Sequence, residues 1–67
     1  MLSKAIKDNF LNTYFNEEEQ VYITEIYDKW KRKPPKILKK TYTKEDAIKA
    51  HEEILEKLEK KLRRKEL

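Results

Sequence analysis

The chain has no glycine among its 67 residues, and this absence limits its fold more than any residue that is present. Glycine adopts a positive φ without steric cost, so tight two-residue turns between paired strands are disfavoured in this chain. The same absence excludes the glycine-rich phosphate loops of P-loop and dinucleotide-binding proteins. We therefore expect long connections between strands and no phosphate-binding loop of either type.

The chain also lacks the side chains on which most enzymes and metal sites depend. It has no cysteine and a single histidine, His51, which excludes a zinc finger. A zinc-protease helix needs a second histidine at position 55, where this chain has Leu55. The only serine, Ser3, lies near the N-terminus, where chains fray. We predict that the protein is not an enzyme and uses no cofactor or metal.

The small size of the chain predicts self-association. A single core in a domain of this length supplies only about 3 to 5 kcal/mol, and no disulfide is available to add to it. No stretch approaches the roughly 18 consecutive apolar residues that a membrane span requires. We expect a homo-oligomer in the cytoplasm with no membrane partner.

The C-terminal third predicts a long helix over residues 43–66. Thr43 is a favourable N-cap, and no proline interrupts the segment that follows it. Such a helix is roughly 34 Å long, whereas a seven-residue strand reaches about 23 Å. Its last turns should therefore extend past the hairpin or contact another copy. The candidate self-association residues are Ile54, Leu55, Leu58 and Leu62.

The N-terminal segment predicts a short helix over residues 3–15. Ser3 can cap it, and its apolar residues recur at spacings of three and four, which is the period of one helical face. We expect this stripe to cover the core. The apolar residues are Leu2, Ile6, Phe10, Leu11, Tyr14 and Phe15.

The middle of the chain has two interpretations. Residues 21–27, VYITEIY, have the β-branched and aromatic composition of a strand, with a bulge near Glu25 where the alternation breaks. The same region, residues 17–32, could instead be a helix capped by Asn16. Local composition favours the strand. Residues 36–42 then form a return strand, and a loop over 28–35 joins the two.

These elements predict one α+β domain over residues 1–67. It contains the short N-terminal helix (3–15), a two-stranded antiparallel β-hairpin (20–42) and the long C-terminal helix (43–66). The order of hairpin and helix, with Tyr42, Thr43, Glu45, Asp46, Ala47 and His51 at their junction, resembles a group of small phage-encoded proteins of unknown function. That group usually has glycine where this chain has Ala50. The resemblance covers about residues 20–60; it implies the hairpin but no activity.

His51 follows Ala47 by one helical turn, beside the apolar stripe of the C-terminal helix. A histidine there can act as a proton switch near pH 6.5 or bind a metal shared at a two-fold axis. No second ligand is visible in the sequence. We therefore favour a structural histidine that holds the helix against the hairpin through one hydrogen bond.

Positive charge is concentrated on the predicted hairpin. Residues 21–44 contain eight Lys or Arg side chains and only two carboxylates, Glu25 and Asp28. An aromatic side chain among several cations can stack on a base while the cations contact phosphates. The alternative is a solvated loop that keeps an edge strand from pairing. The candidate polyanion-binding residues are Lys29, Trp30, Lys31, Arg32, Lys33, Lys36, Lys39 and Lys40.

Two functions remain open from the sequence. The favoured one is a non-enzymatic interaction protein, such as a phage accessory factor that binds a host or viral macromolecule. The alternative is a small nucleic-acid-binding protein that uses the basic hairpin loop, with DNA and RNA not distinguished. Both functions require a surface rather than a catalytic centre.

Overall fold

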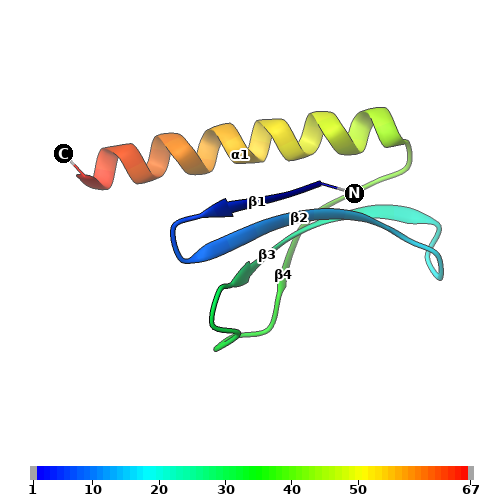
Figure 1. The fold of residues 1–67 in the computed structure, drawn as a ribbon. Coiled ribbons are helices and arrows are strands. Elements are labelled where there is room, and N and C mark those ends of the chain that lie inside the picture. Colours follow the sequence, from blue (N-terminus) through cyan, green and yellow to red (C-terminus); the bar gives the residue numbers. More distant parts are fainter. Residues whose placement is uncertain (1, 67) are drawn as a thin grey trace.

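The computed structural model describes the backbone of residues 2–66 and the side chains of residues 2–61. In this part of the chain, four strands precede one helix (Figure 1). The elements are β1 (Leu2–Ile6), β2 (Asn9–Asn16), β3 (Val21–Asp28), β4 (Lys36–Thr41) and α1 (Lys44–Glu66). The strands form one antiparallel sheet in the order β1-β2-β3-β4, so each strand pairs with its neighbour in sequence.

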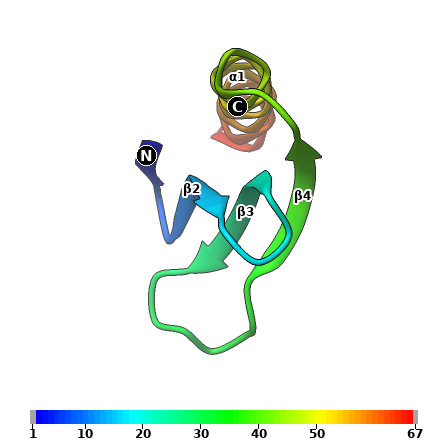
Figure 2. The ribbon, with the colours of Figure 1, turned by 90° about the vertical axis from the view of Figure 1, so that its right-hand side faces the viewer.

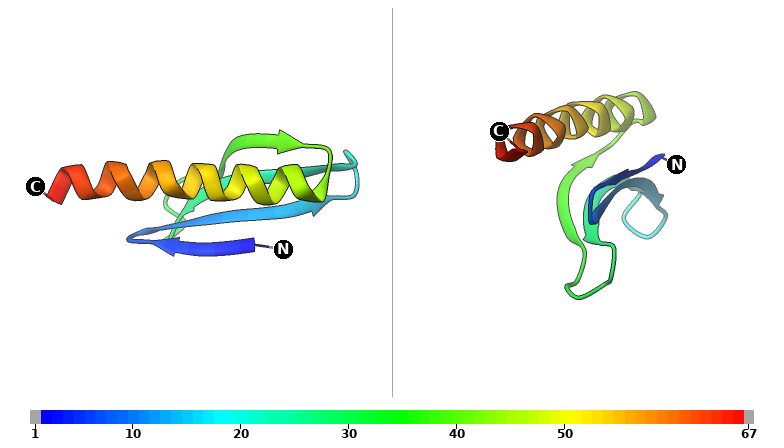
Figure 3. Two further views of the ribbon diagram at one scale, coloured as in Figure 1. Left: turned by 90° about the horizontal axis from the view of Figure 1, so that it is seen from above. Right: turned by 60° about the vertical axis from the view of Figure 1, so that its left-hand side comes forward.

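Helix α1 covers one face of this sheet. The sheet is curled, and α1 lies on its concave side, while the loop between β3 and β4 projects away from the helix (Figure 2). No described element covers the opposite face of β2 and β3, which we call the outer face. The C-terminal turns of α1 extend past the end of the sheet (Figure 3).

The predicted N-terminal helix over 3–15 is wrong, because this segment forms β1, a turn and β2. Its apolar residues are often four apart, as in Leu2 and Ile6 or Phe10 and Tyr14. A spacing of four places two residues on one face of a helix and also on one face of a strand. Pairing of β2 with both β1 and β3 decides in favour of strands. The predicted two-stranded hairpin is therefore a four-stranded sheet.

The expectation that a chain without glycine avoids tight turns is also wrong for β1 and β2. Ile6 pairs with Asn9, so only Lys7 and Asp8 connect the two strands. Lys7 has a φ of 52°, in the left-handed region that costs a residue with a side chain of the order of 1 to 3 kcal/mol. Tertiary contacts hold this turn, because the Lys29 N–H donates to the Asp8 carbonyl at 2.7 Å.

The connection between β2 and β3 contains the cap at Asn16 that also made a helix plausible for the middle segment. Asn16 does act as a cap, since its side chain accepts from the Glu19 N–H at 3.0 Å and its carbonyl from the Gln20 N–H at 2.8 Å. The turn ends at Gln20, whose φ is 59°. Residues 21–28 then pair along the whole of β2, so the strand interpretation is confirmed and the helix is excluded.

The return strand, the long loop before it and the bulge near Glu25 are confirmed. β4 begins at Lys36, so residues 29–35 form the connection. The register between β3 and β4 shifts at Thr24 and Glu25, which leaves Leu38 as the additional residue on β4. β4 is an edge strand, and each of its residues before Thr41 is exposed.

Much of the core lies between the concave face and α1, while Val21 and Ile23 are buried on the other face of β3. Leu11 on β2 and Thr24 on β3 are fully buried. The helix contributes Ala47 and Ala50, whose small side chains allow its backbone to approach the sheet closely. The predicted helix is confirmed, and Thr43 caps it by accepting the Asp46 N–H at 3.1 Å.

A buried polar chain crosses this core from the sheet to the helix. Thr13 on β2 is hydrogen-bonded to Thr24 on β3 at 2.9 Å and to Nδ1 of His51 on α1 at 2.8 Å. All three side chains are buried, and such groups are costly to bury without partners. The structural role predicted for His51 is confirmed, although its partner lies on β2, outside the predicted hairpin.

Replacement of Thr13 by Val should lower the free energy of unfolding by about 1 to 3 kcal/mol. The substitution preserves shape but removes the hydroxyl that partners Thr24 and His51. Thr41→Val is the matched control, because the Thr41 hydroxyl is buried without a hydrogen-bond partner among the described residues. We expect the control to be neutral or stabilising. Urea unfolding followed by circular dichroism measures the free energy of unfolding of each variant. Equal decreases in the two variants would contradict the role of the network.

The stability of the protein should decrease as the pH falls below about 6.5, the ordinary pKa of histidine. Burial lowers the pKa of His51, against a smaller opposing effect of the Glu52 charge. The unfolded chain therefore binds the His51 proton more tightly than the folded chain, and acid favours unfolding. The melting temperature of the wild type should fall between about pH 7.5 and about pH 5.5, more than that of His51→Gln. Identical pH dependence in both proteins would contradict this assignment.

Candidate functional site

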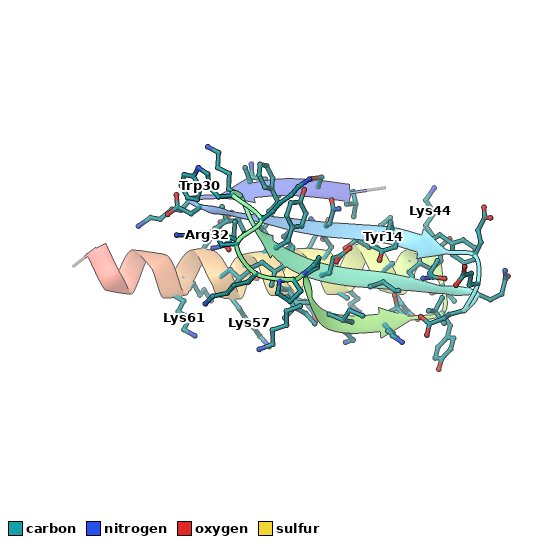
Figure 4. All side chains as sticks on the ribbon, turned by 90° about the horizontal axis from the view of Figure 1, so that it is seen from below. Tyr14, Trp30, Arg32, Lys44, Lys57 and Lys61 are labelled. Carbon is teal, nitrogen blue, oxygen red and sulfur yellow. The ribbon has the colours of Figure 1, made fainter. Side chains whose placement is uncertain are left out.

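The structure places the eight predicted polyanion-binding residues in three adjacent groups, and all of them are exposed. Lys29 and Trp30 begin the loop, and Trp30 lies next to the end of the sheet where β1 and β2 meet (Figure 4). Residues 31–33 lie at the tip of the loop, and Lys36, Lys39 and Lys40 lie on β4. The basic residues thus belong to one continuous segment of the chain, but they lie in different structural settings.

Asp28, the last residue of β3, organises the start of the loop. Its carbonyl accepts the Lys31 N–H at 2.9 Å, and its carboxylate accepts the Arg32 N–H at 3.2 Å. The same carboxylate binds the Arg32 guanidinium through Nε at 2.6 Å and Nη2 at 3.0 Å. The hydrogen bond from Arg32 lowers the pKa of Asp28. Arg32 therefore shapes the loop, and Asp28 compensates its charge.

Trp30 is the exposed aromatic residue of this loop, with 58% of its surface accessible. The Lys29 ammonium lies 5.8 Å from its ring centroid and the Arg32 guanidinium carbon 5.2 Å from it. Both distances are within the range of cation–π attraction. A ligand that stacks on the indole would therefore lie close to the positive charges of Lys29 and Arg32.

Four lysines of the set have neither a carboxylate partner nor a ring contact among the described side chains, whereas Lys29 lies over the Trp30 ring. By contrast, Lys40 donates to Glu19 at 3.0 Å and Arg32 pairs with Asp28. Exposed ion pairs contribute little to stability, but they reduce the charge that a ligand meets. The four unpaired lysines are Lys31, Lys33, Lys36 and Lys39.

A hollow of about 620 Å³ lies between the loop and the outer face of the sheet. Its floor contains Asn12 from β2 with Glu25 and Tyr27 from β3, and residues 31–35 form its wall. Asn12 and Glu25 are direct cross-strand partners. Sequence reasoning missed Asn12 and Glu25 as site residues. The one available signal was Glu25, a carboxylate that interrupts the alternation of an otherwise apolar strand.

The carboxylate of Glu25 makes no ion pair within the described part of the chain, although three cationic residues line the same hollow. Tyr14 lies two residues along β2 from Asn12 on the same face. Burial raises the pKa of the Tyr14 hydroxyl, and the charge of Glu25 and a side-chain hydrogen bond from Tyr14 to this carboxylate raise it further. The Glu25 carboxylate thus accepts a hydrogen bond from Tyr14 and has oxygen lone pairs left for a ligand.

The predicted self-association residues lie on the C-terminal half of α1. Ile54, Leu55 and Leu58 are half-buried in the single chain. The side chain of Leu62 lies outside the described residues. Self-association through this seam stays a prediction.

Two further observations limit the chemistry of the described residues. No group of three His, Cys, Asp or Glu side chains in this part of the chain lies close enough to hold a metal ion. Within the same residues, no helix has both the length and the apolar character needed to cross a membrane.

Comparisons with protein-family models, curated proteins and solved structures found no match for this chain. The resemblance to small phage-encoded proteins therefore stays a prediction.

Replacement of Asp28 by Asn should make Trp30 more mobile, because an amide cannot hold the Arg32 guanidinium through two charge-assisted hydrogen bonds. Trp30 is the only tryptophan of the chain, so its fluorescence anisotropy reports this loop alone. We expect a lower anisotropy in Asp28→Asn than in the wild type. Asp46→Asn, on α1, is the matched control. An unchanged anisotropy, or an equal decrease in the control, would contradict the role of Asp28.

Proposed function

We propose that the protein is a non-enzymatic binding protein whose ligand is a single-stranded nucleic acid. The observation that carries the proposal is the set of four exposed lysines without a carboxylate or ring partner among the described side chains, which we call the basic surface: Lys31, Lys33, Lys36 and Lys39. Lysines of this kind can neutralise phosphates and release counterions, which is the main source of affinity for nucleic acids.

The neighbouring Trp30 favours a nucleic acid over an acidic protein as the ligand. A base can stack on the exposed indole while the lysines contact the phosphates on either side. The stacking of one base contributes about 1 to 3 kcal/mol in proteins that bind single strands. This contact also favours a single strand over a duplex, because a base inside a duplex presents only its edges.

A second candidate function is the binding of a host or viral protein, and the open edge of β4 favours it. Ile37 and Leu38 are exposed there, with 51% and 37% of their surfaces accessible. They lie between the lysines of β4. An acidic extended segment could add to this edge as a further strand, with its carboxylates near the lysines. The lysines oppose the addition of a second copy of β4 by charge repulsion.

The affinity for a short oligo-dT strand should fall steeply with salt. Each phosphate contact contributes a slope of about 0.7 in log affinity per tenfold change in salt, so Lys31→Ala with Lys33→Ala should reduce the slope by about 1.4. Arg32 stays in place because it shapes the loop. Lys57→Ala with Lys61→Ala, on α1, removes the same charge elsewhere and is the matched control (Figure 4).

Fluorescence anisotropy of a labelled oligo-dT strand measures these slopes. The control pair should keep a slope close to that of the wild type, because the two lysines lie outside the basic surface. No binding by the wild type at about 50 mM salt would contradict the proposed function, since phosphate contacts are strong at that concentration. Equal effects of the two pairs would show that net charge, rather than this surface, determines the affinity.

A further inference from the structure

We infer that the hollow between the β3–β4 loop and the outer face of the sheet binds one unpaired guanine base of the nucleic-acid strand. The inference rests on the proposed function and adds a base preference to it. Its basis is the combination of a carboxylate, an amide and an aromatic ring at the floor of the hollow with lysines at its wall.

Three residues on neighbouring positions of β2 and β3 form the floor of the hollow: Asn12, Glu25 and Tyr27. Asn12 pairs with Glu25, and Phe10 pairs with Tyr27. The rings of Phe10 and Tyr27 are stacked, with centroids 5.4 Å apart. A polar pair therefore lies directly beside an aromatic pair. This combination suits a nucleobase, which has a flat apolar face and a polar edge.

The hollow is also large enough to admit a base. Its volume of about 620 Å³ lies within the range of small-molecule sites. The wall is formed by residues 31–35, where two consecutive prolines, Pro34 and Pro35, restrict the backbone. The other end of the loop is held by Asp28 and Arg32. The wall is thus constrained at both ends.

Glu25 determines what can enter the hollow. A carboxylate would repel a phosphate, so the part of the ligand that contacts Glu25 must be uncharged and must donate hydrogen bonds. Lys31 and Lys33 lie at the wall of the same hollow and can contact the adjoining phosphates. This arrangement places the base at the floor of the hollow and the sugar–phosphate backbone of the ligand at its wall.

Guanine is the base that fits a carboxylate best. Its N1–H and its exocyclic N2–H₂ point in parallel from one edge, so the two oxygens of Glu25 can accept from both. Adenine, cytosine and thymine each present donors at only one position of that edge. The adjacent O6 of guanine is an acceptor, which the side-chain NH₂ of Asn12 can reach as a donor. Glu25 and Asn12 together thus match three neighbouring groups of guanine.

The test compares oligo-dT strands of about ten nucleotides that differ only at one central position. The central base is guanine, inosine, adenine or thymine, and a single guanine avoids association of the strands with each other. Inosine keeps N1–H and O6 but lacks the exocyclic amino group, so it removes only the second hydrogen bond to Glu25. We expect the wild type to bind the guanine strand at least about fivefold more tightly than the inosine, adenine and thymine strands.

Glu25→Gln should abolish this preference, because its amide presents only one acceptor oxygen. It should bind the all-thymine strand at least as tightly as the wild type does, since a negative charge is removed. Glu18→Gln removes the same charge from the exposed turn between β2 and β3 and is the matched control, which should keep the preference. Circular dichroism spectra check that both variants are folded.

Three outcomes would overturn the inference. The first is equal affinity of the wild type for the guanine and inosine strands. A guanine preference that persists in Glu25→Gln would assign the preference to other residues. Free dGMP bound as tightly as the guanine strand would mean that the ligand is a nucleotide rather than a base within a strand. Equal binding of all strands leaves the proposed function in place, whereas no binding of any strand contradicts both.

Discussion

The hydrogen bonds that run from Thr24 through Thr13 to His51 determine how the sheet and the helix fit together. They cross a core in which Leu11 and Thr24 are the largest fully buried side chains. Apolar contacts alone tolerate sliding of a helix along a sheet, whereas buried polar groups lose free energy when they are displaced from their partners. The network therefore defines one position of α1 on the concave face, and so decides which face of β2 and β3 stays uncovered.

The loop that carries the candidate site depends on a second set of polar contacts. Lys7, Gln20 and Lys31 all adopt a positive φ. Glycine is the residue that usually occupies such positions, because it adopts a positive φ without steric cost. In all three cases a backbone hydrogen bond holds the turn. The Asp8 carbonyl accepts from Lys29, the Asn16 carbonyl from Gln20 and the Asp28 carbonyl from Lys31. Backbone strain is thus balanced by local hydrogen bonds, and the loop has a defined shape without glycine.

The charges of the loop and β4 divide into two roles. Arg32 and Lys40 have carboxylate partners, so they stabilise local geometry and contribute little positive potential. The lysines of the basic surface lack such partners and remain available for phosphates. Glu25 adds a single acceptor at the floor of the adjacent hollow. In the function that we propose, lysines supply affinity without sequence preference, and the carboxylate supplies the choice of base.

The sequence alone determined the features that arise from near neighbours along the chain. The helix after Thr43, the strand character of residues 21–27, the long loop and the basic residues all follow from capping, composition and charge. It could not determine the N-terminal half, because a spacing of four suits both a helix and a strand, and only pairing with β3 separates them. The hollow and the pairing of Arg32 with Asp28 are likewise products of tertiary structure. Asn12 and Glu25 are 13 positions apart in sequence and become neighbours only through the register of β2 and β3.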